Sequence, residues 1–374
     1  MSISIGIIKE SAEGERRVAL DPPTAAKLIQ AGHKIVLESG AGAEAGHPDE
    51  VWKDVDIVDK ATEVAANSQV LLSVRRPSPD VLAALPEGAL VIGSLAPYSD
   101  FEALEKAAKA KTSLISMELV PRITRAQAMD VLSSQATVAG YKAVIIAADV
   151  APRLFPMLTT AAGTLRPAKA VVIGAGVAGL QAIATARRLG AQVEAYDIRA
   201  AAREQVESLG AKMIDTGVDA ETEGGYAREL TDEERAKQAE ALARHLAKAD
   251  VVISTAAIPG RPAPKIITEA MVADMQPGSV IVDIAAETGG NCELTKAGET
   301  VNANGVLIVG PTNLPSTAPL HASEMYAKNI NNLLALMIKE GELVIDVEDE
   351  VIAGCLLSHE GAVVHEKFKS SGDQ

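Results

Sequence analysis

Aromatic side chains are rare in this chain, at 2% of its 374 residues. The interior must therefore be built mainly from alanine, valine, leucine and isoleucine, and a hydrophobic content of 48% is enough for a sizeable core. No apolar run approaches the roughly 18 residues of a membrane-spanning helix. The amino terminus also has no basic segment followed by an apolar one, as a secretory signal would. These absences predict a cytoplasmic protein with no direct membrane insertion.

Cysteine and net positive charge are also lacking. Cys292 and Cys355 stand far apart and neither belongs to a C-x-x-C pair, so we expect free thiols in a reducing compartment. No histidine or cysteine spacing predicts a metal site. The formal net charge of −15 disfavours a nucleic-acid partner, because an acidic surface repels the phosphate backbone.

Strand and helix patterns alternate along most of the chain. In the N-terminal third, short apolar runs suited to buried strands lie at 3–8, 33–39, 68–74, 89–95 and 112–118. From residue 168 the alternation restarts, with six runs at 169–174, 191–197, 212–214, 249–254, 278–284 and 305–310. Such alternation predicts parallel sheets covered by helices on both faces.

These patterns favour an α/β fold of two doubly wound, parallel-sheet (Rossmann-like) domains with a cleft between them. The tail has a long helical pattern followed by short strands and a hairpin, and it should return to the first sheet because the second is already complete. We therefore expect a discontinuous N-terminal domain, 1–131 with 318–374, and a second domain, 132–317. The acidic, glycine-rich stretch at about 215–230 is typical of a mobile loop. The sequence TDEE that follows, from Thr231, is typical of the capped start of a helix.

The best-defined motif is G-x-G-x-x-G at Gly174, Gly176 and Gly179. It follows a predicted strand and opens a predicted helix. In a dinucleotide-binding turn the first glycine allows the tight bend, the second lets the backbone approach a pyrophosphate, and the third lets helix and strand pack closely. Asp197 ends the next strand, where its carboxylate can accept ribose hydroxyls and repel a 2′-phosphate. The motif therefore favours NAD(H) over NADP(H), although Arg199 lies nearby.

A second polar group lies at Arg122, Gln127, Asp130 and Ser133. The last three are spaced by three residues, so on one helix their side chains would share a face. Their donors and acceptors could hold a nicotinamide carboxamide, and Arg122 could reach an anion or an amide carbonyl. Spacing alone favours equally a capped, salt-bridged helix between domains.

Three segments of the chain carry a family resemblance. They are PRITRAQAMDVLSSQATVAGYKAV at 121–144, VIGAGVAGLQAIATARRLGAQVEAYDIRAAAREQVESLGAK at 172–212, and IPGRPAPKIIT with GSVIVDIAAETGGNCE within 258–293. Together they resemble proton-translocating NAD(P) transhydrogenase, in its NAD(H)-binding alpha subunit. This resemblance implies a homodimer at the cytoplasmic face of the inner membrane. It also implies a partner subunit that binds NADP(H) and membrane-spanning subunits that form a proton channel.

The resemblance also assigns site residues. It implies that a catalytic set contacts the nicotinamide side of NAD(H), with Ile123, Thr124 and Arg125 beside it; the set is Arg122, Gln127, Asp130 and Ser133. On the adenine side it adds Val177, Ile198 and Arg199 to the glycines and Asp197. In the family a mobile loop closes on the nucleotide through a Gly–Tyr pair, which matches Gly225 and the catalytic Tyr226.

Alanine dehydrogenase shares the fold and is the alternative, along with a non-catalytic NAD-sensing protein. That enzyme holds pyruvate with an arginine, matched by Arg16 or Arg17, and with a lysine where Ser73 stands here. It uses a histidine as acid and base, but no histidine lies between His47 and His245. Its aspartate is replaced by Glu287. Reduction of a keto group needs a proton donor, whereas hydride transfer between two nicotinamides needs only approximation and orientation.

Overall fold

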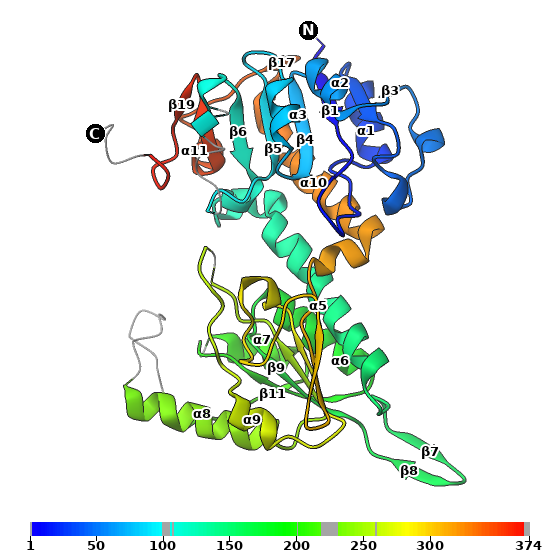
Figure 1. The fold of residues 1–374 in the computed structure, drawn as a ribbon, viewed down its shortest axis with the longest axis vertical. Helices are drawn as coiled ribbons and strands as arrows, with labels where there is room; N and C mark the ends of the chain where they lie inside the picture. The colour runs from blue at the N-terminus through cyan, green and yellow to red at the C-terminus, as the bar shows by residue number, and fades with distance from the viewer. Residues whose placement is uncertain are drawn as a thin grey trace. The chain divides into compact units, whose positions relative to one another are not determined.

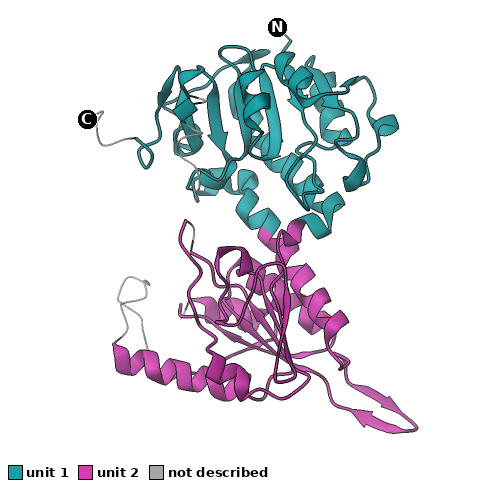
Figure 2. Ribbon diagram, in the orientation of Figure 1, with its two compact units in different colours: residues 1–135, 316–374 teal, residues 136–315 magenta. Residues whose placement is uncertain are grey.

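The computed structural model describes residues 2–98, 105–106, 108–199, 201–217, 231–258 and 260–369. It divides into two compact units, residues 1–135 with 316–374 and residues 136–315 (Figure 2). We refer to them as unit 1 and unit 2. The chain first crosses from unit 1 to unit 2 within helix α5 (Val131–Val150).

Unit 1 is built on one eight-stranded sheet in the order β19-β18-β6-β5-β4-β1-β2-β3 (Figure 1). Its strands are β1 (Ser4–Ile7), β2 (Lys34–Glu38), β3 (Asp56–Val58), β4 (Val70–Arg75), β5 (Leu90–Ser94), β6 (Ser113–Ser116), β18 (Leu356–His359) and β19 (Ala362–Val363). The first six run parallel, while β18 and β19 are antiparallel to their neighbours. All five predicted runs form strands. The short, largely exposed β3 lacks an apolar signal and was not predicted.

Helices cover both faces of this sheet, as strands that are apolar on both sides predict. They are α1 (Pro22–Gln30), α2 (Ala61–Ala66), α3 (Pro79–Ala83), α10 (Pro319–Met337) and α11 (Glu350–Cys355). Leu72 and Ile92 lie in the core shared with α1 and α10, whereas their neighbours Leu71 and Val91 lie in the core shared with α2 and α3. Short 3-10 turns complete the unit at Ala43–Ala45, Asp49–Val51, Met117–Leu119, Thr124–Met129 and Leu314–Thr317, the last at the passage back from unit 2.

The C-terminal tail returns to the first sheet, because β18 pairs with β6. A small hairpin, β16 (Ile338–Lys339) with β17 (Glu342–Leu343), follows α10. The prediction of only short strands and a hairpin after the long helix is wrong at α11. Asp349 caps this helix by accepting hydrogen bonds from the backbone N–H groups of Val351 and Ile352, and so short an apolar run has no period that separates helix from strand.

Unit 2 holds a seven-stranded sheet in the order β11-β10-β9-β12-β13-β15-β14. Its strands are β9 (Lys169–Ile173), β10 (Gln192–Tyr196), β11 (Lys212–Met213), β12 (Val251–Ser254), β13 (Val280–Asp283), β14 (Thr300–Ala303) and β15 (Val306–Val309). The six predicted strands are parallel. A seventh, β14, is antiparallel to β15 at the edge and was missed, since its side chains are exposed or half-buried. Strand order reverses at β9, which has β10 on one side and β12 on the other.

Besides most of α5, the described helices of unit 2 are α6 (Val177–Arg188), α7 (Ala202–Ser208), α8 (Asp232–Leu246) and α9 (Glu269–Ala273), with a 3-10 turn at Ala286–Thr288. The predicted cap of α8 is confirmed. The Thr231 hydroxyl accepts from the Glu234 N–H, and the Glu234 carboxylate accepts from the Thr231 N–H. An unpredicted hairpin, β7 (Leu158–Thr160) with β8 (Gly163–Leu165), forms a two-stranded sheet of its own and projects from unit 2 (Figure 1).

Helix α5 corrects one prediction from the sequence. Among the described residues it is the one helix long and apolar enough to cross a membrane, judged by length and composition alone. Of its most apolar stretch, 44% is buried inside the protein. Ala143, Val144 and Ala147 pack in the core of unit 2. A buried core helix passes the same test, so this is weak evidence for a membrane span.

Candidate functional site

The glycine turn lies at the carboxyl end of β9, where ligands bind in open α/β sheets. Gly174 has φ +88°, a left-handed conformation that suits glycine. A Cβ atom on Gly179 would lie 1.8 Å from the Gly174 carbonyl oxygen, so the third glycine is required for the contact between helix and strand. A Cβ atom on Gly176 would meet no atom of the described residues within 4 Å. The three positions therefore match the roles predicted from the motif.

Helix α6 begins at this turn, with Gly176 as its N-cap. No side chain of the described residues caps this end of the helix, so its first N–H groups and the positive end of its dipole are available to an anion. Val177 is 42% exposed beside them. The open space at Gly176 and the uncapped helix start together fit the pyrophosphate of a dinucleotide.

Asp197 follows β10 and lies beside the turn. One carboxylate oxygen accepts a hydrogen bond from the Ala175 N–H at 2.7 Å. The guanidinium of Arg199 forms two further hydrogen bonds to the carboxylate, at 3.0 and 2.9 Å. Burial opposes ionisation of Asp197, but the hydrogen bonds from Arg199 and from backbone N–H groups lower the pKa of its carboxyl group. Between the two, Ile198 is 56% exposed, which is unusual for so apolar a side chain.

Thr255 is a site residue that the motif did not predict. It directly follows β12, and its hydroxyl oxygen lies 3.1 Å from the carbonyl oxygens of both Ile173 and Gly174. The hydroxyl therefore holds the glycine turn from the neighbouring strand. Thr255 lies at the carboxyl end of β12, the strand that adjoins β9 where the strand order reverses. This position in the sequence is the signal that could have identified it.

Asn291 supports the same edge of the sheet from within. This fully buried side chain accepts hydrogen bonds from the Ser254 hydroxyl at 2.7 Å and the Ala256 N–H at 3.0 Å. Its amide group donates to the carbonyl oxygens of Ala256 at 2.7 Å and Pro264 at 2.9 Å. All four hydrogen bonds fix the segment that follows β12. Two glycines before Asn291 marked a constrained backbone, but nothing in the sequence identified its partners.

The predicted nicotinamide set lies in unit 1, and its helical arrangement differs from the expectation. Gln127 is in a 3-10 turn, Thr124–Met129, whereas Ser133 is in α5. Asp130 stands between them with extended backbone and accepts from the Ser133 N–H at 2.9 Å and hydroxyl at 2.6 Å. The single shared helical face is therefore wrong, because Asp130 ends one helix and caps the next.

The other predicted residues of this segment differ in exposure. Arg122, Thr124 and Gln127 are exposed, and Ile123 packs partly buried against the core of unit 1. Arg125 forms a close ion pair with Asp349, the N-cap of α11. Its side chain thus has a structural partner within unit 1.

Gly225 and Tyr226, with most of the predicted loop at 215–230, lie outside the described residues. The next described residue is Thr231, the N-cap of α8.

The residues considered for an alanine dehydrogenase have partners of their own. The buried guanidinium of Arg17 donates to the Glu15 carboxylate at 2.7 and 2.6 Å and to the side-chain amide oxygen of Gln135 at 2.9 Å. Burial would raise the pKa of Glu15, but Arg17 lowers it to about 2. Arg16 is half exposed and pairs with Glu44 at 3.4 Å. These contacts stabilise both arginines without an external carboxylate.

Two further predicted positions stand apart from these ion pairs. The Ser73 hydroxyl is buried and has no hydrogen-bond partner among the described residues. Glu287 is exposed in the 3-10 turn after β13, at the carboxyl edge of the unit 2 sheet.

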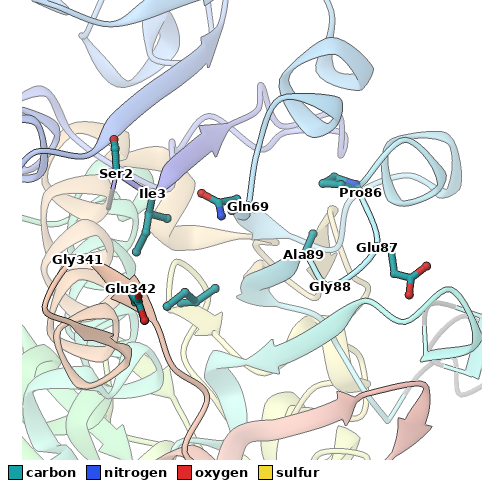
Figure 3. Close-up of a pocket in the computed structure, with 10 residues that line it drawn as sticks. Ser2, Ile3, Gln69, Pro86, Glu87, Gly88, Ala89, Gly341 and Glu342 are labelled. Carbon is teal, nitrogen blue, oxygen red and sulfur yellow. The ribbon is translucent and has the colours of Figure 1, made fainter.

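Two cavities lie away from the glycine turn. One of about 490 Å³ lies at the amino ends of β1, β4 and β5 in unit 1, where Ile3, Gln69 and Ala89 line it (Figure 3). The other, about 550 Å³, lies at the amino ends of β9, β10 and β11 in unit 2 and is lined by Lys169, Gln192, Lys212 and others. Parallel strands place these ends opposite the carboxyl edge. Within the described residues no group of histidine, cysteine, aspartate and glutamate is arranged to hold a metal ion.

Comparison with known proteins agrees with this geometry. The family model described as "Alanine dehydrogenase/PNT, N-terminal domain" matches residues 6–139, and the corresponding C-terminal domain matches residues 143–366. An NAD(P) transhydrogenase alpha subunit of Rhodospirillum rubrum is 45% identical over 99% of this chain and 100% of its own length. The alanine dehydrogenase of Mycolicibacterium smegmatis is 27% identical, over 97% and 95% respectively.

Solved structures lead to the same relatives. A transhydrogenase from Sinorhizobium meliloti superposes with a TM-score of 0.88 at 47% identity, covering 96% of this chain and 100% of that one. An L-alanine dehydrogenase superposes with a TM-score of 0.82 at 25% identity, covering 98% of each. The chain therefore belongs to the alanine dehydrogenase/PNT family and, within it, groups with the alpha subunits of NAD(P) transhydrogenase.

Proposed function

We propose that this chain is the NAD(H)-binding subunit of a proton-translocating NAD(P) transhydrogenase and presents NADH for direct hydride transfer to NADP⁺ on a partner subunit. The observation that carries the proposal is the 45% identity, over the full length of both chains, to the transhydrogenase alpha subunit of Rhodospirillum rubrum. The alanine dehydrogenase of Mycolicibacterium smegmatis is much less similar, at 27% sequence identity.

The chemistry of this reaction needs little from the side chains of this protein. A bound nicotinamide supplies or accepts the hydride at its C4 carbon, and no proton moves at the ring. The task of this chain is therefore to bind the dinucleotide and orient it, which alone can lower a barrier by ~7–11 kcal/mol. An acid and base beside the ring, as a keto-acid reductase requires, would add nothing to such a transfer.

The residues of unit 2 would bind the pyrophosphate and adenosine end. Backbone N–H groups at the uncapped start of α6 hold the pyrophosphate above Gly176. Asp197 accepts the ribose hydroxyls, while the exposed side chains of Val177 and Ile198 offer apolar surface to the adenine.

The residues of unit 1 would bind the nicotinamide end. Arg122 and Gln127 are exposed and carry donors for a carboxamide oxygen. The Asp130 carboxylate already holds Ser133 in place at 2.6 Å, so this pair offers a fixed group of polar atoms. We assign loop closure on the nucleotide to Gly225 and Tyr226, which rests on the resemblance alone.

The assembly would include an NADP(H)-binding subunit and membrane-spanning subunits that form the proton channel, with this chain peripheral at the cytoplasmic face of the inner membrane. A homodimer is supported by the projecting β7–β8 hairpin. Among the described residues it is a two-stranded sheet paired with no other strand. Leu158 and Leu165 on it are 40% and 56% exposed, and Met157 just before it is 63% exposed. Such a hairpin is marginally stable alone, and clustered exposed apolar side chains favour a protein partner.

Reconstitution tests the proposal. The purified chain should bind NADH in a titration and, mixed with an NADP(H)-binding transhydrogenase subunit, should transfer hydride from NADH to an NADP⁺ analogue. Robust turnover of NADH with pyruvate and ammonium by the chain alone would instead identify an alanine dehydrogenase. Tight NADH binding with no transfer in the reconstituted mixture would indicate an NAD-sensing protein.

A further inference from the structure

The carboxylate of Asp197 has no unused acceptor position in this structure. Its Oδ1 atom accepts from the Arg199 N–H at 2.8 Å and from Arg199 Nε at 3.0 Å. Its Oδ2 atom accepts from Ala175 N–H at 2.7 Å and from an Arg199 terminal nitrogen at 2.9 Å. A carboxylate has about four lone-pair sites, so a ribose hydroxyl bound here must share an oxygen with Arg199 or with the turn.

The two side chains differ in how firmly they are held. The Asp197 side chain is 6% exposed, whereas that of Arg199 is 55% exposed. Among the described residues, Asp197 is the only carboxylate that forms an ion pair with Arg199. The aspartate is thus fixed by the glycine turn, while the guanidinium is a solvent-facing group restrained by this one partner.

This pairing changes how the site can discriminate between dinucleotides. An acid at the end of the second strand is expected to repel a 2′-phosphate. Here a guanidinium lies 2.9–3.0 Å from that acid, so the pair is neutral and the repulsion is largely cancelled. A planar guanidinium is also the side chain best suited to bind a phosphate through two parallel hydrogen bonds.

We propose that Arg199 is able to bind a 2′-phosphate but is kept from doing so by its ion pair with Asp197. Asp197 would determine NAD(H) specificity through this ion pair. The proposal rests on the NAD(H)-binding function proposed above. With Asp197 ionised, the guanidinium of Arg199 is occupied by the carboxylate and is not available to a 2′-phosphate on the ribose. Without that negative charge, Arg199 is free to turn toward a phosphate on the 2′ position, and the site accepts NADP(H).

The direction of the Asp197 pKa agrees with this mechanism. Burial opposes ionisation, but Arg199 and the backbone N–H groups lower the pKa of the carboxyl group. The pKa of Arg199 is raised by its hydrogen bonds to Asp197. Both groups therefore stay charged near neutral pH, where their ion pair is intact.

The test compares two fragments that differ only in the 2′-phosphate, adenosine 5′-monophosphate and adenosine 2′,5′-bisphosphate, titrated calorimetrically alongside NADH and NADPH. In Asp197→Asn, affinity for the bisphosphate relative to the monophosphate should rise at least about tenfold over wild type, a shift of ~1.4 kcal/mol. In the double variant Asp197→Asn with Arg199→Ala, that gain should disappear. Added salt should reduce the gain, since it depends on charge.

Controls separate this inference from simpler explanations. Glu194→Gln removes one negative charge from β10 away from the turn and should leave the ratio unchanged. If the double variant keeps the full gain of Asp197→Asn, or if Asp197→Asn gains nothing, Arg199 does not bind a 2′-phosphate. Asp197→Ser replaces Asp197→Asn in the same comparison if the latter does not fold. Wild-type protein that binds no NADH would overturn the proposed function and, with it, this inference.

Discussion

A Cβ atom built on Gly179 would lie 1.8 Å from the carbonyl oxygen of Gly174. The helix after the turn and the strand before it are therefore in direct backbone contact. In Gly179→Ala, α6 must move away from β9, and we expect a loss of roughly 1–3 kcal/mol in the free energy of unfolding. Thermal and urea unfolding of the variant without nucleotide measure this loss.

Gly176→Ala is the matched comparison in the same turn. In the part of the chain that the structure describes, no atom lies within 4 Å of the added Cβ, and φ is −77°, so stability without nucleotide should match wild type. The methyl group would instead occupy the space where the pyrophosphate approaches, and affinity for NADH should fall about tenfold or more, ~1.4 kcal/mol. Normal NADH affinity in Gly176→Ala would contradict the role assigned to this position.

Asp130→Ala should affect both stability and hydride transfer. It removes the cap of α5, which accepts from Ser133 N–H at 2.9 Å, and such losses cost ~0.5–2 kcal/mol. It also removes a proposed nicotinamide contact, so transfer in the reconstituted mixture should slow. Thr268→Ala removes a comparable cap from α9 and should lower stability alone. Equal transfer rates in the two variants would assign Asp130 a purely structural role.

Glu10 should give stability a distinctive pH dependence. Burial raises the pKa of its carboxyl group from 4.5 to about 7, although the N–H groups of Val74 and Arg75 favour the ionised form. Between these two values the native state holds a proton that the unfolded chain has released. The contribution of Glu10 to the free energy of unfolding should therefore be greatest below pH 4.5 and fall as pH rises through 7, by as much as ~3 kcal/mol.

Urea unfolding of Glu10→Gln between pH 5 and 8 isolates this contribution. The difference in unfolding free energy between wild type and Glu10→Gln should shrink or change sign as pH rises, because only wild type must bury a charge. Glu13→Gln, at an exposed position in the same segment, should keep a constant difference from wild type. A constant difference for Glu10→Gln as well would mean that Glu10 titrates normally.

The β7–β8 hairpin should hold two copies of the chain together. Leu165→Lys places a charge among the exposed apolar side chains of the hairpin, and the sedimentation-equilibrium mass should shift from dimer toward monomer. Val51→Lys alters a similarly exposed apolar position, 43% exposed in unit 1, and should leave the mass unchanged. A monomeric wild type, or a dimer unaffected by Leu165→Lys, would exclude this hairpin as the interface.

Tyr226→Ala tests the residue whose role rests on resemblance alone. Loss of the phenol should slow hydride transfer in the reconstituted mixture while the unfolding midpoint without nucleotide stays close to wild type. Single-turnover kinetics together with thermal unfolding give both quantities. Wild-type rates would assign the loop a different purpose.

The sequence by itself determined the parallel-sheet architecture and the glycine turn. Buried strands such as 169–173 and 251–254 need apolar residues on both faces, and this local signal survives any packing arrangement. The glycine roles were also local, because each depends on backbone within a few residues of the turn. The short edge strands β3 and β14 were missed, since exposed strands carry little apolar pattern.

Tertiary structure alone decided which polar side chains meet. The hydroxyl of Thr255 reaches Gly174, 81 residues earlier in the chain, and Arg125 pairs with Asp349, 224 residues later. Even the ion pair of Asp197 and Arg199, only two residues apart, depends on the fold, because Ala175 in the glycine turn after β9 fixes the carboxylate. Apolar burial follows residue type and period, whereas a hydrogen bond needs two particular atoms within about 3 Å, and only the packed strands bring them there.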